Sequence, residues 1–293
     1  MTNAPIKIKT FGWQNGILGQ ISMINEGLKN IGIELSDEEP NILYKNEDFY
    51  DEVIEFTNKC KKKPFCIFNI LDLQLGNPRY DLNKLKEQLL FADAITCISE
   101  TVKKEIKQYL DLDAVNIGNP IRDITYNPEI KKEIDFLIVG RNSDPNKRAT
   151  IFESLLWNNS GRTFAVAGPE PLPHIRDGYL GVLKNHELNE IYNMSKFVIC
   201  CSKREGLLLT IPEACCGGAI PLIASDMSTA KEWDLPTFTV EPNVESINNK
   251  VKELENDYKF YQEIALSYGN GFREKFNKNQ IAKNILEVYL KNS

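Results

Sequence analysis

Residues 202–214 read SKREGLLLTIPEA, a segment that places Glu205 and Glu213 eight residues apart. Glu205 is expected in a loop. Glu213 falls in the first turn of a predicted helix, because Pro212 suits the first helical position and Thr210 or its neighbour can cap it. The start of a helix carries about half a positive charge and free N–H groups, which suit an anion. The two carboxylates cannot hold phosphate, but they can accept hydrogen bonds from sugar hydroxyls. A phosphate seat beside hydroxyl acceptors is what a nucleotide-sugar requires.

Length and composition set the class of protein. The chain has 293 residues, which is room for two domains of ordinary size. Its net charge of −6 argues against a protein whose main task is to bind polyanions, although a local basic groove stays compatible with it. No stretch approaches the ~20 apolar residues of a membrane helix. The first residues lack the apolar core of a signal peptide, so we expect a cytoplasmic protein.

Seven cysteines, none of them in Cys-x-x-Cys spacing, are interpreted as small buried hydrophobic residues in a reducing compartment. The alternative is a redox or metal-binding role. The chain has only two histidines, His174 and His186, which disfavours a zinc site, and no metal site is predicted.

Short apolar strands alternate with amphipathic helices along both halves of the chain. In the first half we predict strands at 6–10, 42–44, 65–68 and 94–98, and in the second half at 135–140, 163–168, 179–181, 197–201 and 219–224. Strands that alternate with helices imply parallel βαβ units, so the fold class is α/β. Two successive blocks predict two Rossmann-like domains, with the cleft between them as the default site.

A polar stretch at 122–133, with Asn127-Pro128 as a turn signal, is interpreted as the linker. This gives an N-terminal Rossmann-like domain over residues 1–122 and a C-terminal one over 123–275. The tail from 244 to 292 is predicted to be mostly helical, with a break near 268–271. Its last helix, over 276–293, could cross back to the N-terminal domain.

The second block opens with GRNSDPNK, residues 140–147. A predicted strand ends at Gly140, and the loop after it carries Arg141 and Lys147. Ligands of open α/β sheets bind beyond the carboxyl ends of the strands. Arg141 offers a planar fork and Lys147 a point charge to the oxygens of a diphosphate. The alternative is that both are surface charges on a solvated loop.

Four stretches of the second half resemble the retaining, nucleotide-sugar-dependent glycosyltransferases of the two-domain GT-B type, the group 1 or family 4-like enzymes. Their order and spacing are similar to the family's, whereas any one stretch alone would be weak. They are Gly140-Arg141 with Lys147; FAVAG at 164–168; GYLG at 178–181 followed by His186-Glu187-Leu188 and Ile191-Tyr192; and the run 201–226, which includes Glu205-Gly206, Glu213-Ala214, Gly217-Gly218 and IASD at 223–226.

The resemblance implies a role for each matching residue. Arg141 and Lys147 would hold the diphosphate, near Gly140 and the helix start at Thr210. Glu213 would accept hydrogen bonds from the ribose hydroxyls, and Glu205 would contact the transferred sugar. The backbone around Gly206 and Leu207 would line the sugar seat. The first domain would bind the acceptor and the second the donor, with C-terminal helices completing a GT-B fold.

The first half matches more loosely. The loop 15–19, which includes Gly16, sits where the family has a glycine loop that faces the donor phosphates; the alternative is an ordinary βα turn. Many members carry a histidine in the first domain, but this chain has none before His174. Asn69 and Asp72 stand in the corresponding place and could contact the sugar or acceptor, with a plain strand-end cap as the alternative for Asp72.

A second departure is Leu208, where many members have glycine, so the sugar pocket could be reshaped. We nevertheless expect transfer of a sugar from a nucleoside diphosphate donor, UDP-linked rather than GDP-linked, to an acceptor hydroxyl. The resemblance implies retention of configuration without a metal. A nucleotide-sugar epimerase or phosphorylase and a non-catalytic nucleotide-sugar-binding protein are the alternatives. A glycan, a lipid-linked sugar, a protein, a small molecule or a modified DNA base stays open as acceptor, and the sequence indicates no oligomeric state.

Overall fold

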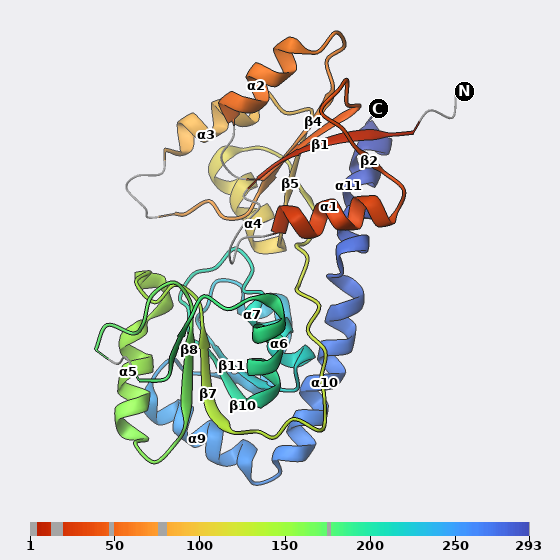
Figure 1. Ribbon diagram of the computed structural model, residues 1–293. Coiled ribbons are helices and arrows are strands. Elements are labelled where there is room, and N and C mark those ends of the chain that lie inside the picture. The colour runs from red at the N-terminus through yellow and green to blue at the C-terminus, as the bar shows by residue number, and fades with distance from the viewer. Residues whose placement is uncertain (1–4, 13–19, 47–49, 76–80, 175–176, 293) are drawn as a thin grey trace. The chain divides into compact units, whose positions relative to one another are not determined.

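The computed structural model of the protein consists of two α/β units, each built on a six-stranded parallel sheet (Figure 1). One unit comprises Met1–Pro120 and Phe276–Ser293, and the other comprises Ile121–Lys275. The expected boundaries were 122/123 and 275/276. The structure describes residues 5–12, 20–46, 50–75, 81–174 and 177–292.

The sheet of the first unit has the order β2-β1-β3-β4-β5-β6, so the direction of winding reverses between β1 and β3. Its strands are β1 (Lys7–Phe11), β2 (Glu34–Leu35), β3 (Ile42–Lys45), β4 (Phe65–Ile70), β5 (Ala94–Cys97) and β6 (Val115–Asn116). Its helices are α1 (Gln20–Asn30), α2 (Tyr50–Lys59), α3 (Leu82–Leu89), α4 (Glu100–Glu105) with the π segment η2 (Ile106–Leu110), and α11 (Lys278–Asn292).

The two faces of this sheet are covered by different helices. α1 and α11 bury Ile24, Leu28, Ile281 and Ile285 on one face, whereas α2, α3 and α4 cover the other. α1 and α11 pack so closely that a Cβ at Gly27 would lie 2.2 Å from the carbonyl oxygen of Lys278. The C-terminal helix therefore belongs to the core of the first unit.

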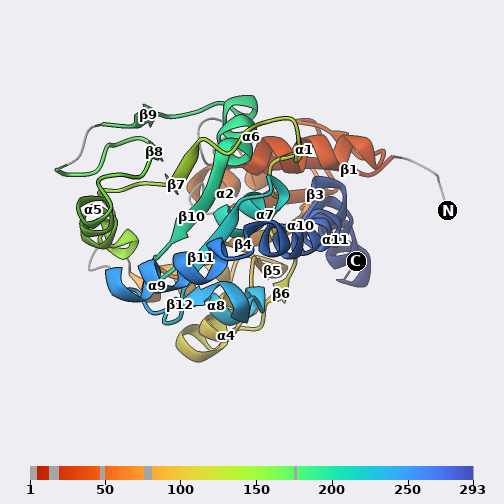
Figure 2. The same ribbon diagram turned by 90° about the horizontal axis from the view of Figure 1, so that it is seen from below.

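The sheet of the second unit has the order β9-β8-β7-β10-β11-β12 (Figure 2). Counted within the unit this is 3-2-1-4-5-6, the strand order of dinucleotide-binding folds, whose switch point lies between the first and fourth strands. The strands are β7 (Ile134–Val139), β8 (Phe164–Ala167), β9 (Tyr179–Gly181), β10 (Ser195–Cys200), β11 (Ile220–Ala224) and β12 (Thr239–Val240). Here the switch point is between β7 and β10.

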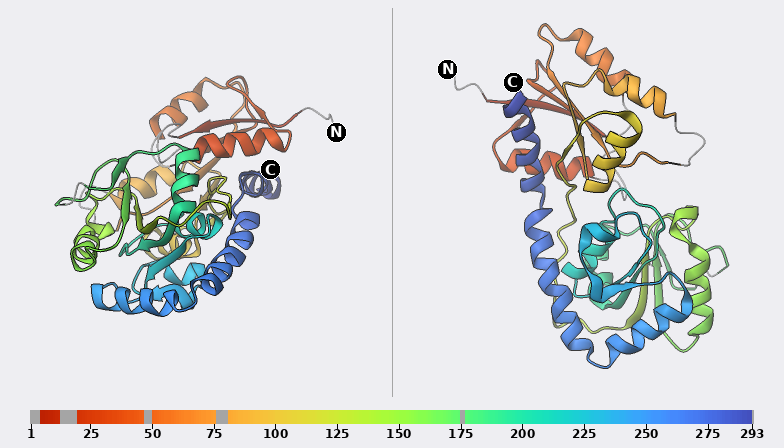
Figure 3. Two further views of the ribbon diagram at one scale, coloured as in Figure 1. Left: turned by 60° about the horizontal axis from the view of Figure 1, so that its bottom comes forward. Right: turned by 180° about the vertical axis from the view of Figure 1, so that it is seen from behind.

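Helices cover both faces of this second sheet. The helical elements are η3 (Pro145–Lys147), α5 (Ala149–Asn158), α6 (Asn185–Met194), α7 (Thr210–Cys216), α8 (Ala230–Trp233), η4 (Pro236–Phe238), α9 (Val244–Glu255) and α10 (Tyr258–Lys275). α5 contacts α9 on one side of the sheet, and α7 packs against α10 on the other, as views from the front and from behind agree (Figures 1 and 3).

The α/β class and the two Rossmann-like sheets are confirmed, and so are the longer strands. Two local predictions are wrong. α10 runs without a break through 268–271, because Gly269 packs against α7, where a Cβ would lie 2.7 Å from the backbone of Cys215. α7 begins at Thr210 without a side-chain cap, so Pro212 is the third helical residue, a position whose N–H would also lack a partner in the helix.

Within the part of the chain that the structure describes, no helix combines the length and the apolar character needed to cross a membrane.

Candidate functional site

Two loops meet at the switch point of the second sheet. The loop that follows β7 carries Gly140, Arg141 and Lys147, and the loop that follows β10 carries Glu205. A hydrogen bond of 2.8 Å from the N–H of Lys203 to the carbonyl oxygen of Asn146 ties one loop to the other. The carboxyl ends of adjacent parallel strands bring these loops together.

Lys147 and Glu205 form the central ion pair of this edge. The Lys147 Nζ lies 2.6 Å from the Glu205 Oε1, and the two side chains are 16% and 17% exposed. The side chain of Lys147 passes over Gly140, where a Cβ would lie 3.5 Å from its Cε. The pair is thus partly withdrawn from water, which strengthens its attraction relative to a surface pair.

Gly168 is required at this edge of the sheet because its backbone lies very close to that of Gly140. Gly168 follows β8, and a Cβ built on it would lie 1.9 Å from the carbonyl oxygen of Gly140. Its φ of 155° lies in the region that favours glycine. Any side chain at this position would push apart the ends of β7 and β8, and with them the start of the loop that carries Lys147.

A small hollow, partly open to solvent, lies beside the ion pair. Lys147, Asn142, Ser202 and Thr210 supply its polar lining, and Leu208, which is 7% exposed, supplies part of its apolar wall. The remaining lining residues are Ile138, Val139, Phe152, Ile199 and Cys200. A cation and several hydroxyl or amide groups on an apolar base suit a small polar anion.

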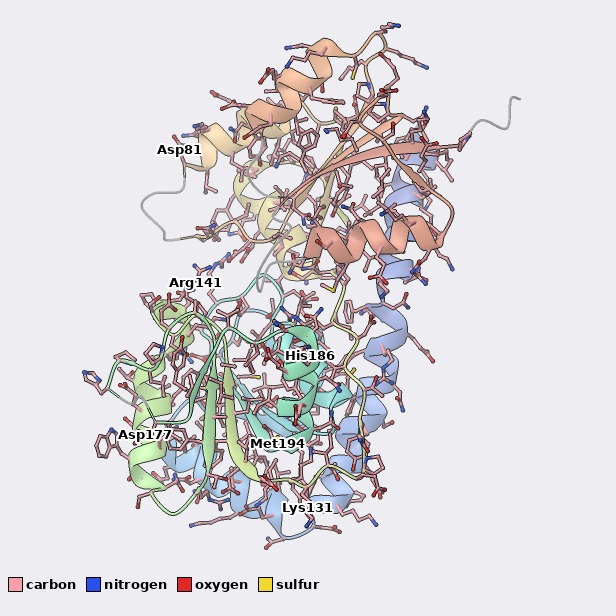
Figure 4. The ribbon with its side chains drawn as sticks, viewed as in Figure 1. Asp81, Lys131, Arg141, Asp177, His186 and Met194 are labelled. Carbon is pink, nitrogen blue, oxygen red and sulfur yellow. The ribbon has the colours of Figure 1, made fainter. Side chains whose placement is uncertain are left out.

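Arg141 lies apart from this lining. It follows the carboxyl end of β7, opposite the end of the sheet where Lys131 lies (Figure 4). Its side chain is exposed and forms no ion pair within the described part of the chain. Of the two predicted phosphate cations, Lys147 alone lines the hollow, whereas Arg141 stands at the same edge of the sheet in solvent.

Glu213 occupies a different environment from the one its predicted role suggests. Its side chain is 1% exposed, and its Oε1 lies 2.8 Å from the Arg122 Nη1. The N–H of Arg122 donates to the same oxygen at 3.3 Å, and the Tyr192 hydroxyl donates to Oε2 at 3.1 Å. A carboxylate offers about four acceptor positions. A ribose hydroxyl would therefore share Glu213 with Arg122 and Tyr192. The predicted contact between Glu213 and the ribose stays a prediction.

The charge on Glu213 changes the titration of both neighbours. Burial opposes the charge of Arg122, but the attraction of Glu213 outweighs it, so the pKa of the guanidinium is raised above its ordinary value. Burial and, after it, the Glu213 carboxylate raise the pKa of the Tyr192 phenol well above its usual range. Sequence reasoning missed Arg122, because it lies in a stretch that was interpreted as a polar linker.

The remaining predicted residues are placed as follows. Asn69 is the last residue but one of β4 in the first unit, where its amide donates to Asn46 and accepts from Thr96, both at 2.9 Å. Asp72 accepts from the N–H of Gln74 at 3.1 Å and so caps the turn after β4. Acceptor contacts of Asn69 and Asp72 stay predictions. Gly206 is buried and Leu207 half-buried in the loop after β10, and Gly16 lies outside the described residues.

Sequence comparisons match no protein-family model and no curated protein. Solved structures match well. HepE of Anabaena, in complex with UDP and glucose, aligns over 98% of this chain and 100% of its own, with a TM-score of 0.75 and 12% identity. The chain has the GT-B fold.

Two further structures agree with this assignment. A glycosyltransferase from Rickettsia africae aligns over 99% of both chains, with a TM-score of 0.70 and 12% identity. Sucrose-phosphate synthase from Thermosynechococcus elongatus aligns over 86% of this chain and 73% of its own, with a TM-score of 0.68 and 12% identity. At such low identity the GT-B likeness establishes the fold alone.

Proposed function

We propose that this protein is a glycosyltransferase that moves a sugar from a nucleoside diphosphate sugar to an acceptor hydroxyl, with retention of configuration. The observation that carries the proposal is the Lys147–Glu205 pair beside a hollow at the switch point of the second sheet. Open α/β sheets bind their ligands at this place. A cation for the diphosphate and a carboxylate for sugar hydroxyls are thereby adjacent.

In this proposal Lys147 and Arg141 stabilise the charge that develops on the leaving diphosphate. Preorganised charges aimed at such a group supply a large share of catalysis in many enzymes. Lys147 is positioned by its pair with Glu205, and the exposed Arg141 could close onto the phosphate when the donor binds. Glu205 would then accept hydrogen bonds from the sugar, and the loop backbone at Gly206 and Leu207 would line the sugar seat.

In a front-face reaction, the proton of the acceptor hydroxyl can be removed without a side-chain base. The acceptor oxygen bonds to the anomeric carbon, the bond from that carbon to the phosphate oxygen breaks, and this oxygen takes the acceptor proton. The lack of a histidine in the first half of the chain is compatible with this route. We also propose that the reaction requires no metal.

UDP-sugar is the favoured donor. HepE, which shares the fold, is known in complexes with UDP, with UDP and glucose, and with UDP-glucose. The first unit would bind the acceptor, whose identity stays open among a glycan, a lipid-linked sugar, a protein, a small molecule and a modified DNA base. Glu213 would meet the ribose hydroxyls, with Arg122 and Tyr192 orienting it.

The first experiment measures the thermal unfolding of the protein with UDP, GDP, UDP-glucose and GDP-mannose. A ligand that binds the folded state raises the melting temperature in proportion to the logarithm of its concentration above Kd. Lys147→Ala should weaken UDP binding about 10- to 150-fold, since a hydrogen bond to a charged group contributes roughly 1.5–3 kcal/mol. Lys131→Ala is the matched control, because Lys131 is exposed at the opposite end of the same unit (Figure 4).

Product analysis then separates transfer from the other reactions. Incubation with UDP-glucose and a panel of acceptors should yield an α-linked glycoside from the α-linked donor. An epimer or a free sugar formed from the donor alone would replace the transferase assignment. Binding of UDP-glucose without any product across a broad panel would indicate a binding protein. Equal UDP affinity in Lys147→Ala and wild type would refute the phosphate assignment.

A further inference from the structure

The turn after β11, residues 225–229, contacts the loop that carries Glu205. The N–H of Ser228 donates to the carbonyl oxygen of Lys203 at 3.0 Å. The Ser228 hydroxyl accepts from the N–H of Glu205 and donates to the carbonyl oxygen of Glu205, both at 3.0 Å. A serine hydroxyl has one donor and two acceptor positions, so one Oγ can satisfy both backbone groups of the same residue.

The backbone of Glu205 needs such support because of where it lies. Glu205 is in the segment 201–209, between the end of β10 and the start of α7, outside any helix or strand. Backbone groups there have no ladder of regular hydrogen bonds. Gly206 follows directly and adds conformational freedom to the chain. Without the Ser228 hydroxyl, the backbone of Glu205 loses two of the bonds that fix its direction.

The same turn also holds the neighbour of Lys147. Asp226 accepts two hydrogen bonds from the Arg148 guanidinium, at 2.8 and 2.6 Å. Arg148 has φ 53° and ψ 49°, a left-handed conformation that is unfavourable for residues other than glycine. The hydrogen bonds from Arg148 lower the pKa of Asp226 below its ordinary value. The turn thus contacts both the backbone of Glu205 and the residue that follows Lys147.

The turn is itself well anchored. Met227 and Thr229, on either side of Ser228, are buried. The N–H of Ser225 donates to Val240 of β12 at 2.9 Å, and the N–H of Met227 donates to the carbonyl oxygen of Ala224 at 3.1 Å. A hydroxyl can orient a neighbouring loop only from a fixed position, and these contacts provide one.

We propose that Ser228 is a positioning residue for Glu205. Its hydroxyl holds the backbone of Glu205 so that the carboxylate meets the hydroxyls of the transferred sugar. This inference rests on the proposed function, because Ser228 acts through Glu205 and not on the nucleotide. It therefore predicts an effect on the sugar part of the donor that the diphosphate part does not share.

The test compares Kd values for UDP and UDP-glucose, measured by calorimetry. Ser228→Ala should lower the affinity for UDP-glucose relative to UDP about tenfold, which corresponds to about 1.4 kcal/mol, and should leave UDP affinity unchanged. Ser228→Thr keeps the hydroxyl and should retain the wild-type ratio. Ser225→Ala is the matched control. Ser225 lies on the same turn, but its hydroxyl donates to Glu241 at 2.7 Å and not to Glu205. It should also retain the ratio.

A double-mutant cycle shows whether Ser228 acts through Glu205. Glu205→Ala should lower the affinity for UDP-glucose relative to UDP. Adding Ser228→Ala to that variant should cause no further change in this ratio. If the wild type binds neither ligand, the proposed function fails and this inference with it. If Glu205→Ala changes the ratio and Ser228→Ala does not, only this inference is overturned. Equal losses of UDP and UDP-glucose affinity in Ser228→Ala would overturn it as well.

Discussion

The Arg122–Glu213 pair makes a quantitative prediction about stability. Glu213 is 1% exposed and Arg122 is 11% exposed, with 2.8 Å between their charged atoms. Arg122→Met keeps most of the aliphatic stem but leaves a buried carboxylate whose remaining partners, within the described part of the chain, are the Tyr192 hydroxyl and the backbone N–H of residue 122. Removal of one member of a buried pair costs about 3–5 kcal/mol, since the remaining charge stays desolvated.

The loss should be visible in both chemical and thermal unfolding. Urea titration followed by tryptophan fluorescence reports on this unit, because Trp233 is buried in it. For a unit of this size, 3 kcal/mol corresponds to a fall in the melting temperature of roughly 6–12 °C. The double variant Arg122→Met with Glu213→Gln should recover part of the loss, because no unpaired charge then remains buried.

Lys250→Met is the matched control. Lys250 pairs with Glu253 at 2.8 Å in the same unit, but the two side chains are 21% and 52% exposed. Water and salt screen such a pair, so the expected cost is about 1 kcal/mol or less. A cost below about 1 kcal/mol for Arg122→Met, or a double variant that loses the full sum of the single losses, would refute the argument from burial.

Three further predictions concern pH, backbone packing and the two glutamates. Burial lowers the pKa of Lys132 to about 7, so the folded state binds fewer protons than the unfolded state above that pH, and stability should rise from pH 7 toward 10. Lys132→Met should remove this rise and stabilise the protein at pH 6, by at most about 5 kcal/mol; an equal pH dependence of the melting temperature in variant and wild type from pH 6 to 10 would contradict this. Gly168→Ala should cost several kcal/mol, since its Cβ would lie 1.9 Å from the carbonyl oxygen of Gly140, and an unchanged urea midpoint would reject that geometry. Glu213→Gln should weaken UDP binding, whereas Glu205→Gln should leave UDP binding unchanged and lower both the affinity for UDP-glucose and the rate of transfer from it; the reverse pattern would exchange their roles.

Periodicity along the chain was sufficient to predict the architecture. The alternation of apolar strands with amphipathic helices predicted both parallel sheets, because each βαβ unit is a local pattern with its own turn signals. The sequence placed Lys147 and Glu205 in loops that follow two predicted strands, and parallel strands end at one edge, but it did not predict the ion pair between them. The strands β2, β6 and β12 were not predicted separately, because two residues carry no alternation.

Contacts between distant segments decided the rest. Arg122 and Glu213 are 91 residues apart, and nothing near either residue indicates that they are buried against each other. Gly269 looked like a helix breaker, but it is a contact point between α10 and α7, so packing overrides its weak helical propensity.

From its sequence alone, the protein was determined to be α/β with two Rossmann-like blocks, because the hydrophobic periodicity of strands and helices is a local property of the sequence. Only the tertiary structure showed that Arg141 is left in solvent, that Glu213 is shared with Arg122 and Tyr192, and that Ser228 holds the backbone of Glu205. These outcomes depend on which side chains become neighbours when the chain folds. Burial and hydrogen-bond geometry, and not residue type, then set what each charge can do.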